Sequence, residues 1–192
     1  MNASASSQAV SSRRHPARAI EPAGDDQDAQ AAGEPTQFLT FSLNSEMFAV
    51  GIDNIKEIIE FGQPTEVPMM PGFIRGVINL RGAVVPVIDL NARFGRAASA
   101  ASRRSCIVIV EVPAEEGAQD IGIMVDAVSA VLEIPAAEIE PPPSFGSRIR
   151  SEFLQGMGKV DGRFVMILSI AHVLSVDELA LLGEAVDASA AA

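Results

Sequence analysis

The residues that could carry chemistry are few in this sequence and lie far apart. Two carboxylates can share acid and base work, and Asp53 and Asp126 are paired by equivalent positions in two similar segments. The histidines, His15 and His172, have no neighbours that suggest a metal-ligand set or a catalytic triad. Cys106 lies in an apolar run, where a small buried hydrophobic residue is expected. We predict no catalytic residue, no metal site and no cofactor.

Motifs for phosphate and metal chemistry are also missing. The glycines at 72, 76 and 82 lack the spacing and the Lys-Ser/Thr pair of a Walker A loop, and there is no HExxH, no CxxC and no EF-hand loop. Turn formation explains Asp53 and Asp126, which occupy equivalent positions in two similar segments. A small hydrolase or ligand-binding barrel built on these two acids is a remote alternative.

The composition limits the class of protein. Of 192 residues 48% are hydrophobic and 5% aromatic, with no Trp and no Tyr, so the core must be built from Val, Ile, Leu and Phe. A net charge of −11 disfavours nucleic acid and anionic lipid as partners. No apolar run approaches the roughly 20 residues of a membrane-spanning helix, so direct membrane insertion is not expected. The single cysteine excludes an internal disulfide and favours a reducing, cytoplasmic compartment.

The elements that must position any site are short β-strands. Residues 1–36 are rich in Ala, Ser, Gln, Asp and Pro and are predicted to be a disordered tail. After them come eight β-type runs, bounded by Gly, Pro, Asn or Asp, at 38–43, 47–52, 73–80, 83–90, 106–112, 121–128, 153–160 and 163–170. Short helices are expected at 53–59 with Asp53 as cap, at 89–94, and at 175–185 with Ser175 as cap. Residues 185–192 should fray.

An internal repeat relates the two halves of this region. Three segments of the first half match three of the second in the same order: 38–43 with 107–112, 48–61 with 121–134, and 73–90 with 153–170. We therefore predict two copies of a five-stranded unit, over about 38–90 and about 105–170, joined by a polar stretch. Five short strands that curl on themselves form a small barrel, and two barrels leave a groove where a partner can dock.

The two copies differ at one hairpin turn. Copy two has Asp161-Gly162, which suits a two-residue turn whose first central residue has positive φ. Copy one has Arg81 there, and an exposed guanidinium suits pairing with a partner's carboxylate; a solvated Arg without a role is the alternative. Asn79 either satisfies the turn backbone or faces a partner. Glu57 lies either on a solvated face or at the rim of an interface.

Several motifs together carry a family resemblance. They are PGFIRGVINLRGAVVPVIDL (71–90), IKEII (55–59), IGIMVDAVSAVLEI (121–134), PPPSF (141–145), FLQGMG (153–158) and VMILSIAHVL (165–174). From Phe38 to about Gly183 the chain resembles the CheW family of chemotaxis coupling proteins. The resemblance implies a mainly β fold, two intertwined five-stranded SH3-like barrels with short helices and a C-terminal helix. The expected domain is 37–184.

The resemblance also implies partners and a place in the cell. Proteins of this family bridge the cytoplasmic tip of methyl-accepting chemoreceptors and the regulatory domain of the histidine kinase CheA, at the inner face of the membrane. Carried over by motif, the receptor-binding positions are Ile55, Glu57, Asn79 and Arg81. The interface with the kinase or a ring neighbour includes Phe145 and Glu140, where some members carry a basic residue instead of the acid.

The resemblance predicts an adaptor for chemotaxis. The alternative is a similar adaptor in a non-flagellar pathway for pili or biofilm control. The same fold also occurs inside the kinase and fused to a receiver domain. The chain has no room for a kinase ATP domain or a receiver of roughly 120 residues, so a stand-alone adaptor is expected.

Overall fold

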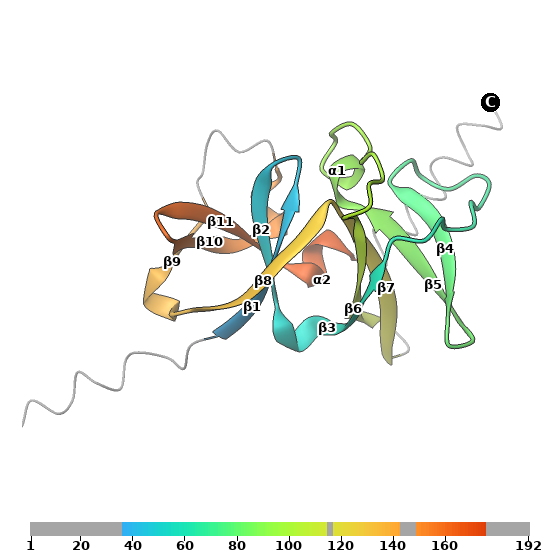
Figure 1. Ribbon diagram of the computed structural model, residues 1–192. Coiled ribbons are helices and arrows are strands. Elements are labelled where there is room, and N and C mark those ends of the chain that lie inside the picture. Colours follow the sequence, from blue (N-terminus) through green and yellow to red (C-terminus); the bar gives the residue numbers. More distant parts are fainter. Residues whose placement is uncertain (1–35, 115–116, 143–148, 176–192) are drawn as a thin grey trace, which may run out of the picture. The chain divides into compact units, whose positions relative to one another are not determined.

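The computed structural model describes residues 36–114, 117–142 and 149–175. The predicted N-terminal tail, apart from Thr36, lies outside these residues. So do Phe145, residues 185–192 and, beyond Ser175, the predicted C-terminal helix. Within the described part the chain is mainly β, with two mixed sheets and a few short helices, as the sequence predicted (Figure 1).

The first sheet has six strands in the order β8-β1-β2-β11-β10-β9. Hairpins join β1 to β2 and β10 to β11, and β11 runs parallel to β2 through the pairs Met166–Phe48 and Ile167–Ala49. The strand bounds are β1 Thr36–Leu43, β2 Glu46–Gly51, β8 Ala127–Ile134, β9 Ile139–Glu140, β10 Leu154–Val160 and β11 Arg163–Leu168.

The second sheet has five strands in the order β3-β6-β7-β5-β4. Here β5 runs parallel to β7 through pairs such as Val87–Gly122 and Ile88–Ile123, and the other pairs are antiparallel. The strand bounds are β3 Ile55–Glu60, β4 Ile74–Leu80, β5 Ala83–Asp89, β6 Cys106–Ala114 and β7 Gly117–Val125.

Each sheet combines strands from both copies of the repeat. The first takes β1 and β2 from copy one and β8 to β11 from copy two, whereas the second takes β3, β4 and β5 from copy one and β6 and β7 from copy two. The parallel pairs β2–β11 and β5–β7 are equivalent in the two sheets (Figure 1). Backbone hydrogen bonds between the copies therefore hold each sheet together, and the five strands of one copy do not form a sheet of their own.

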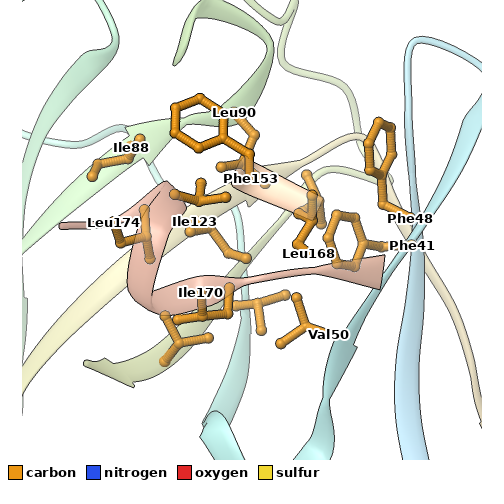
Figure 2. Close-up of a cluster of buried hydrophobic side chains, with 14 of the residues drawn as sticks. Phe41, Phe48, Val50, Ile88, Leu90, Ile123, Phe153, Leu168, Ile170 and Leu174 are labelled. Carbon is orange, nitrogen blue, oxygen red and sulfur yellow. The ribbon is translucent and has the colours of Figure 1, made fainter. Parts of the chain in front are cut away.

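Three hydrophobic clusters stabilise this arrangement. One lies within each sheet: Phe38, Ala49, Ile134, Val165 and Ile167 in the first, and Val85, Val87, Ile107, Ile109 and Met124 in the second. The third and largest contains side chains from both sheets and from the short helices (Figure 2). Burying one such side chain contributes about 1.5–3 kcal/mol.

Phenylalanine rings run through the largest cluster. Phe41 stacks on Phe48 at 6.2 Å between centroids, Phe48 on Phe94 at 5.8 Å, and Phe94 meets Phe153 at 6.0 Å. These rings come from the first sheet, from the residue after α1 and from the turn before β10. These ring contacts connect the two copies, because Phe153 belongs to copy two and the other three rings precede it. Cys106 is a half-buried free thiol that packs against the same cluster.

The predicted helix at 53–59 is wrong. A short 3-10 turn covers Ile52–Asn54, and the following residues form β3, whose burial alternates residue by residue. Ile55, Ile58 and Ile59 are β-branched, which favours a strand, and pairing with β6 satisfies one edge of the backbone. The matching segment of copy two forms β8, so copies one and two agree with each other here.

The short helix after β5 was predicted correctly. Helix α1 spans Leu90–Arg93, and the buried carboxylate of Asp89 caps it by accepting hydrogen bonds from the backbone N–H groups of Asn91 and Ala92. The same carboxylate accepts bonds from the N–H and hydroxyl of Ser99. Asp89 therefore anchors the polar stretch between the copies. Other helical turns are α2 at Ile170–Val173, Ala136–Glu138 and Ser151–Phe153.

Two equivalent glycines allow a close crossing of the chain in each copy. A side chain at Gly76, whose φ is 132°, would collide with the backbone carbonyl of Thr65. A Cβ at Gly156 would lie 2.6 Å from Cγ2 of Ile139 and 2.9 Å from the carbonyl oxygen of Glu140. Thr65 forms an isolated β-bridge with Val77 of β4, and Glu140 pairs in the equivalent way with Met157 of β10. The glycines shared by the copies thus serve the scaffold.

Candidate functional site

The turn between β4 and β5 has the conformation that the sequence predicted. Arg81 has a φ of 51° and Gly82 a φ of 92°, so both central residues are left-handed. In the hairpin of β10 and β11, Asp161 has a φ of 49° and Gly162 a φ of 75°. An L-residue other than Asn, Asp or Gly pays about 1–2 kcal/mol for this conformation. Arg81 therefore occupies a position that its backbone does not favour.

The guanidinium of Arg81 pairs with Glu57. Its Nη2 donates a hydrogen bond of 3.0 Å to Oε2 of Glu57, and the Arg81 side chain is 81% exposed while that of Glu57 is 26% exposed. Glu57 lies on β3 and Arg81 follows β4, the two outer strands of the second sheet. The ion pair therefore shows that this sheet curls until its edges approach each other.

A bulge in β3 orients Glu57. The register with β6 shifts between Ile55 and Glu57, which leaves Lys56 without a partner residue on β6. The Lys56 ammonium lies 2.6 Å from Glu111 and 2.7 Å from Asp120, on β6 and β7. Hydrogen bonds to Asp120 and then to Glu111 raise the pKa of Lys56 above 10.5. These contacts hold the bulge against the sheet, with Glu57 just beyond it.

Asn79 supports the turn. Its Oδ1 accepts a hydrogen bond of 2.9 Å from the backbone N–H of Gly82. Of the two roles that the sequence left open, the structure therefore shows backbone satisfaction for this oxygen. The residue is exposed, and Val84 is its direct cross-strand partner.

The structure brings together only some of the predicted site residues. Glu57, Asn79 and Arg81 cluster around one turn. Ile55 lies two residues before Glu57, but its side chain packs against the largest hydrophobic cluster. Glu140 is exposed on β9 of the other sheet, where it pairs with Met157. Phe145 lies outside the described residues.

Exposed apolar side chains are the residues that the sequence reasoning missed. Val84 is 71% exposed and Ile58 is 43% exposed, and they lie beside Asn79 and Glu57 respectively. Copy two repeats this exposure at Phe164 and Val131, which are 55% and 49% exposed. The β-branched residues of 55–60 are the only local signal for a strand there, and the apolar-polar order of this segment does not alternate, so the exposure of Ile58 could not be predicted from the sequence.

The described residues show no arrangement for catalysis at the two acids singled out by the sequence. Asp126 accepts a hydrogen bond of 2.6 Å from the backbone N–H of Asn44, so it supports the turn between β1 and β2. Asp53 is exposed in the 3-10 turn before β3. Among the described residues no group of three or more His, Cys, Asp or Glu side chains could hold a metal ion.

Comparison with known proteins identifies the family. The model of the CheW-like domain matches residues 37–178. The chain belongs to the CheW family. The chemotaxis protein CheW of Klebsiella aerogenes is 35% identical over 153 residues, which cover 79% of this chain and 90% of that protein. The chemotaxis protein CheW of Rhizobium meliloti is 31% identical over 142 residues, which cover 74% of this chain and 89% of that protein.

A solved structure of the CheW family agrees with this assignment. The scaffolding protein TtCheW from Thermoanaerobacter tengcongensis is 35% identical and superposes with a TM-score of 0.67, over 76% of this chain and 91% of that one. The chain is therefore a chemotaxis scaffolding adaptor of the CheW family and not an enzyme. None of the described helices is long and apolar enough to cross a membrane.

Proposed function

We propose that this CheW-family adaptor couples the cytoplasmic tip of methyl-accepting chemoreceptors to the regulatory domain of the histidine kinase CheA. The receptor-binding surface comprises Glu57, Asn79 and Arg81, with Ile55 below it in β3. The kinase or a ring neighbour contacts a second surface that includes Glu140 and Phe145. The adaptor acts in the cytoplasm, where its receptors recruit it to the inner membrane face.

The conformation of Arg81 is the observation that supports this proposal best. A left-handed Arg costs about 1–2 kcal/mol, and its exposed ion pair with Glu57 returns only about 0.2–1 kcal/mol. The folded state alone therefore gives little reason for Arg at this place, since Asp161 makes the same turn in copy two. Backbone strain of this kind is common at binding sites.

Exposed apolar residues beside the ion pair suit a helical partner. Val84 lies across the hairpin from Asn79, and Ile58 follows Glu57 in β3. An amphipathic helix binds through apolar side chains on one face. Charged groups at the rim then fix its register and its encounter rate more than its affinity. In this scheme the Arg81 guanidinium pairs with a carboxylate of the receptor helix, either in place of Glu57 or in addition to it.

Signals pass through such an adaptor by differential binding. A scaffold without chemistry shifts the balance between receptor and kinase states only if it binds one of them better. Glu140 is exposed on the other sheet from Arg81, so the two proposed surfaces use different parts of the fold. The acid at this position favours a ring neighbour or kinase surface with a basic residue opposite it.

Co-sedimentation with receptor-containing membranes and kinase tests the receptor surface. We expect Arg81→Glu to abolish recruitment of the adaptor and activation of the kinase. The substitution places an acid beside Glu57, so this surface repels the receptor carboxylate that the guanidinium would bind. Arg163→Glu is the matched control, because Arg163 is an exposed base beside the equivalent turn of copy two. Unchanged recruitment by Arg81→Glu would remove this residue from the receptor surface.

Identification of the pathway needs a separate measurement. An affinity pull-down from the native cytoplasm, with the wild-type adaptor and Arg81→Glu side by side, reveals which receptors are lost together with Arg81. Chemotaxis receptors in that set support the function proposed here. Receptors of a pilus or biofilm system would assign the adaptor to a non-flagellar pathway.

A further inference from the structure

The short helices α1 and α2 occupy equivalent places in the two copies. Helix α1 follows β5 and helix α2 follows β11, the second strands of the two hairpins. In each copy the residue before the helix donates a backbone hydrogen bond to the phenylalanine that precedes the hairpin. Asp89 donates to the carbonyl oxygen of Phe73 over 2.8 Å, and Ser169 donates to that of Phe153 over 2.9 Å. The two helices and the two phenylalanines are therefore matched parts of the duplicated unit.

Arg93, the last residue of α1, reaches from copy one into copy two. Its Nε donates a hydrogen bond of 3.1 Å to the carbonyl oxygen of Val173, which is the last residue of α2 and the equivalent of Arg93 itself. The guanidinium carbon lies 5.3 Å from the centre of the Phe73 ring and 4.9 Å from that of Phe153. Both distances lie within the roughly 6 Å over which a ring face attracts a cation. One half-buried guanidinium thus contacts both phenylalanines of the equivalent pair.

Only one of the two copies makes this contact. The buried side chain of Val173 has neither a charge nor a hydrogen-bond donor, so α2 cannot bind α1 in the same way. The last carbonyl groups of a helix have no partner within the helix, and an arginine side chain can satisfy them. Arg93 does this for the helix of the other copy. Like Arg81, it is a residue that the duplicated scaffold alone does not require.

The Arg93 contact adds direction to an otherwise apolar interface between the copies. Phe153 belongs to the largest hydrophobic cluster, and Phe73 packs against that cluster. Apolar burial holds such surfaces together but is non-directional. A hydrogen bond, in contrast, weakens steeply when its angle is wrong, and a guanidinium between two rings is attracted to their faces. Arg93 therefore favours one orientation of the two copies among those that the apolar contacts would allow.

We propose that Arg93 is a positioning residue, which fixes the orientation of the two copies and thereby couples the two proposed binding surfaces. Phe73 directly precedes β4, which leads to the turn of Arg81. Phe153 directly precedes β10, which pairs with β9 and its exposed Glu140. Arg93 thus contacts the residue that begins the path to each surface, and a shift at one surface is transmitted to the other. The coupling rests on the proposed function, whereas the fixed orientation does not.

Distances between spin labels on the two hairpins test the orientation. The labels are attached to the full chain through Ala83→Cys and Arg163→Cys in a Cys106→Ser background, because 83 and 163 are exposed and equivalent positions at the starts of β5 and β11. Pulsed electron paramagnetic resonance gives the distribution of their distance. Arg93→Met keeps an apolar stem without the guanidinium, and we expect it to widen the distribution at least about twofold, because the copies then sample several orientations. Arg93→Lys keeps a cation at the rings and should restore part of the native width.

Arg150→Met is the matched control for the loss of a guanidinium. The Arg150 guanidinium carbon also lies 4.9 Å from the centre of the Phe153 ring, but both residues belong to copy two. This variant removes a cation from the same ring and should leave the width of the distribution unchanged. Phe73→Leu removes the ring of copy one from the Arg93 contact and should widen the distribution as Arg93→Met does. It provides the test if urea unfolding shows that Arg93→Met does not fold.

Calorimetry tests the coupling between the two surfaces. The affinity of the unlabelled adaptor for the regulatory domain of the kinase is measured with and without a saturating concentration of the receptor tip. We expect the receptor tip to change this affinity at least about fivefold for the wild type and less than about twofold for Arg93→Met. Each partner alone should bind both forms equally well. A variant that is only destabilised would not lose the coupling while it keeps both affinities.

Two results would overturn the proposal. Native widths of the distance distribution in folded Arg93→Met and Phe73→Leu would show that Arg93 does not fix the orientation. Equal coupling in the wild type and Arg93→Met, including no coupling in either, would show that Arg93 does not connect the surfaces. A wild-type adaptor that binds neither partner would contradict the proposed function instead, and the distance distributions then decide the role of Arg93.

Discussion

The hairpins β4–β5 and β10–β11 share one backbone and differ in what they present to solvent. Both turns place two consecutive residues at positive φ, and both first strands contain a glycine at the crossing of the chain. Copy two places Asp161 in the turn, whereas copy one places Arg81 there and pairs it with Glu57. In copy two the residue equivalent to Glu57 is Ala130, so no such ion pair is possible.

This difference separates residues of the scaffold from residues of the proposed binding surface. Features that both copies share, such as Gly76 and Gly156, satisfy packing constraints that the duplication preserved. A residue that only one copy carries, against the preference of its backbone, needs another explanation. For Arg81 we propose that the explanation is the receptor.

The largest expected effect concerns the shared glycines. Gly76→Ala should destabilise the fold by about 3 kcal/mol, because the new Cβ meets a backbone carbonyl and the φ of 132° is strained for alanine. Gly156→Ala should cost less, about 1–2 kcal/mol, because its φ is not in the strained positive range, the nearest atom belongs to the Ile139 side chain, which can move, and the backbone carbonyl oxygen of Glu140 at 2.9 Å needs only a small shift. Urea unfolding of the two variants measures the difference. Equal losses would show that the crossings are not constrained in this way.

A transplanted arginine should have a smaller effect. Asp161→Arg is expected to destabilise the chain by about 1 kcal/mol, because it puts a left-handed Arg into copy two without an acid opposite it. Adding Ala130→Glu should recover about 0.2–1 kcal/mol by rebuilding the ion pair. Urea unfolding of both variants measures these steps. If Asp161→Arg is neutral, the turn does not strain arginine and the argument for Arg81 loses its basis.

The bulge in β3, compared with an exposed lysine of copy two, offers the smallest test. Lys56 occupies the bulge in β3, and its pKa is raised above 10.5 by the carboxylates of Asp120 and Glu111. Its stabilising contribution is therefore fully present below pH 10.5 and is lost as the pH rises through the folded-state pKa. The stability difference between wild type and Lys56→Met should narrow at such alkaline pH. Lys159→Met removes an exposed lysine of β10 that has no ion pair among the described residues, and it is the matched control for the loss of a lysine side chain.

Much of the fold could be predicted because the strands are short, apolar and clearly bounded. All eight predicted β-type runs form strands, and the repeat correctly aligned β3 with β8. The segment of β3 was misread because three charged residues and three isoleucines at 55–60 also suit a short helix. Pairing with β6 decided the outcome, and such long-range pairing is invisible in a local pattern.

Less of the site could be predicted from the sequence. The positive φ of Arg81 followed from comparison of the two turns, but its contact with Glu57 did not. That contact arises only when the outer strands of the second sheet approach each other, which depends on the whole sheet. The exposure of Val84 and Phe164 was missed for the same reason, since both lie in runs that read as buried strands.

The affinity of the receptor tip for Arg81→Asn tests the central claim most directly. Asparagine tolerates the left-handed turn, so this variant removes the guanidinium while the backbone and the Asn79 hydrogen bond remain. Urea unfolding should show stability equal to or above that of the wild type. We predict a dissociation constant for the receptor at least about tenfold higher, equivalent to about 1.4 kcal/mol. An unchanged dissociation constant in a folded variant would contradict the assignment of Arg81 to the receptor surface.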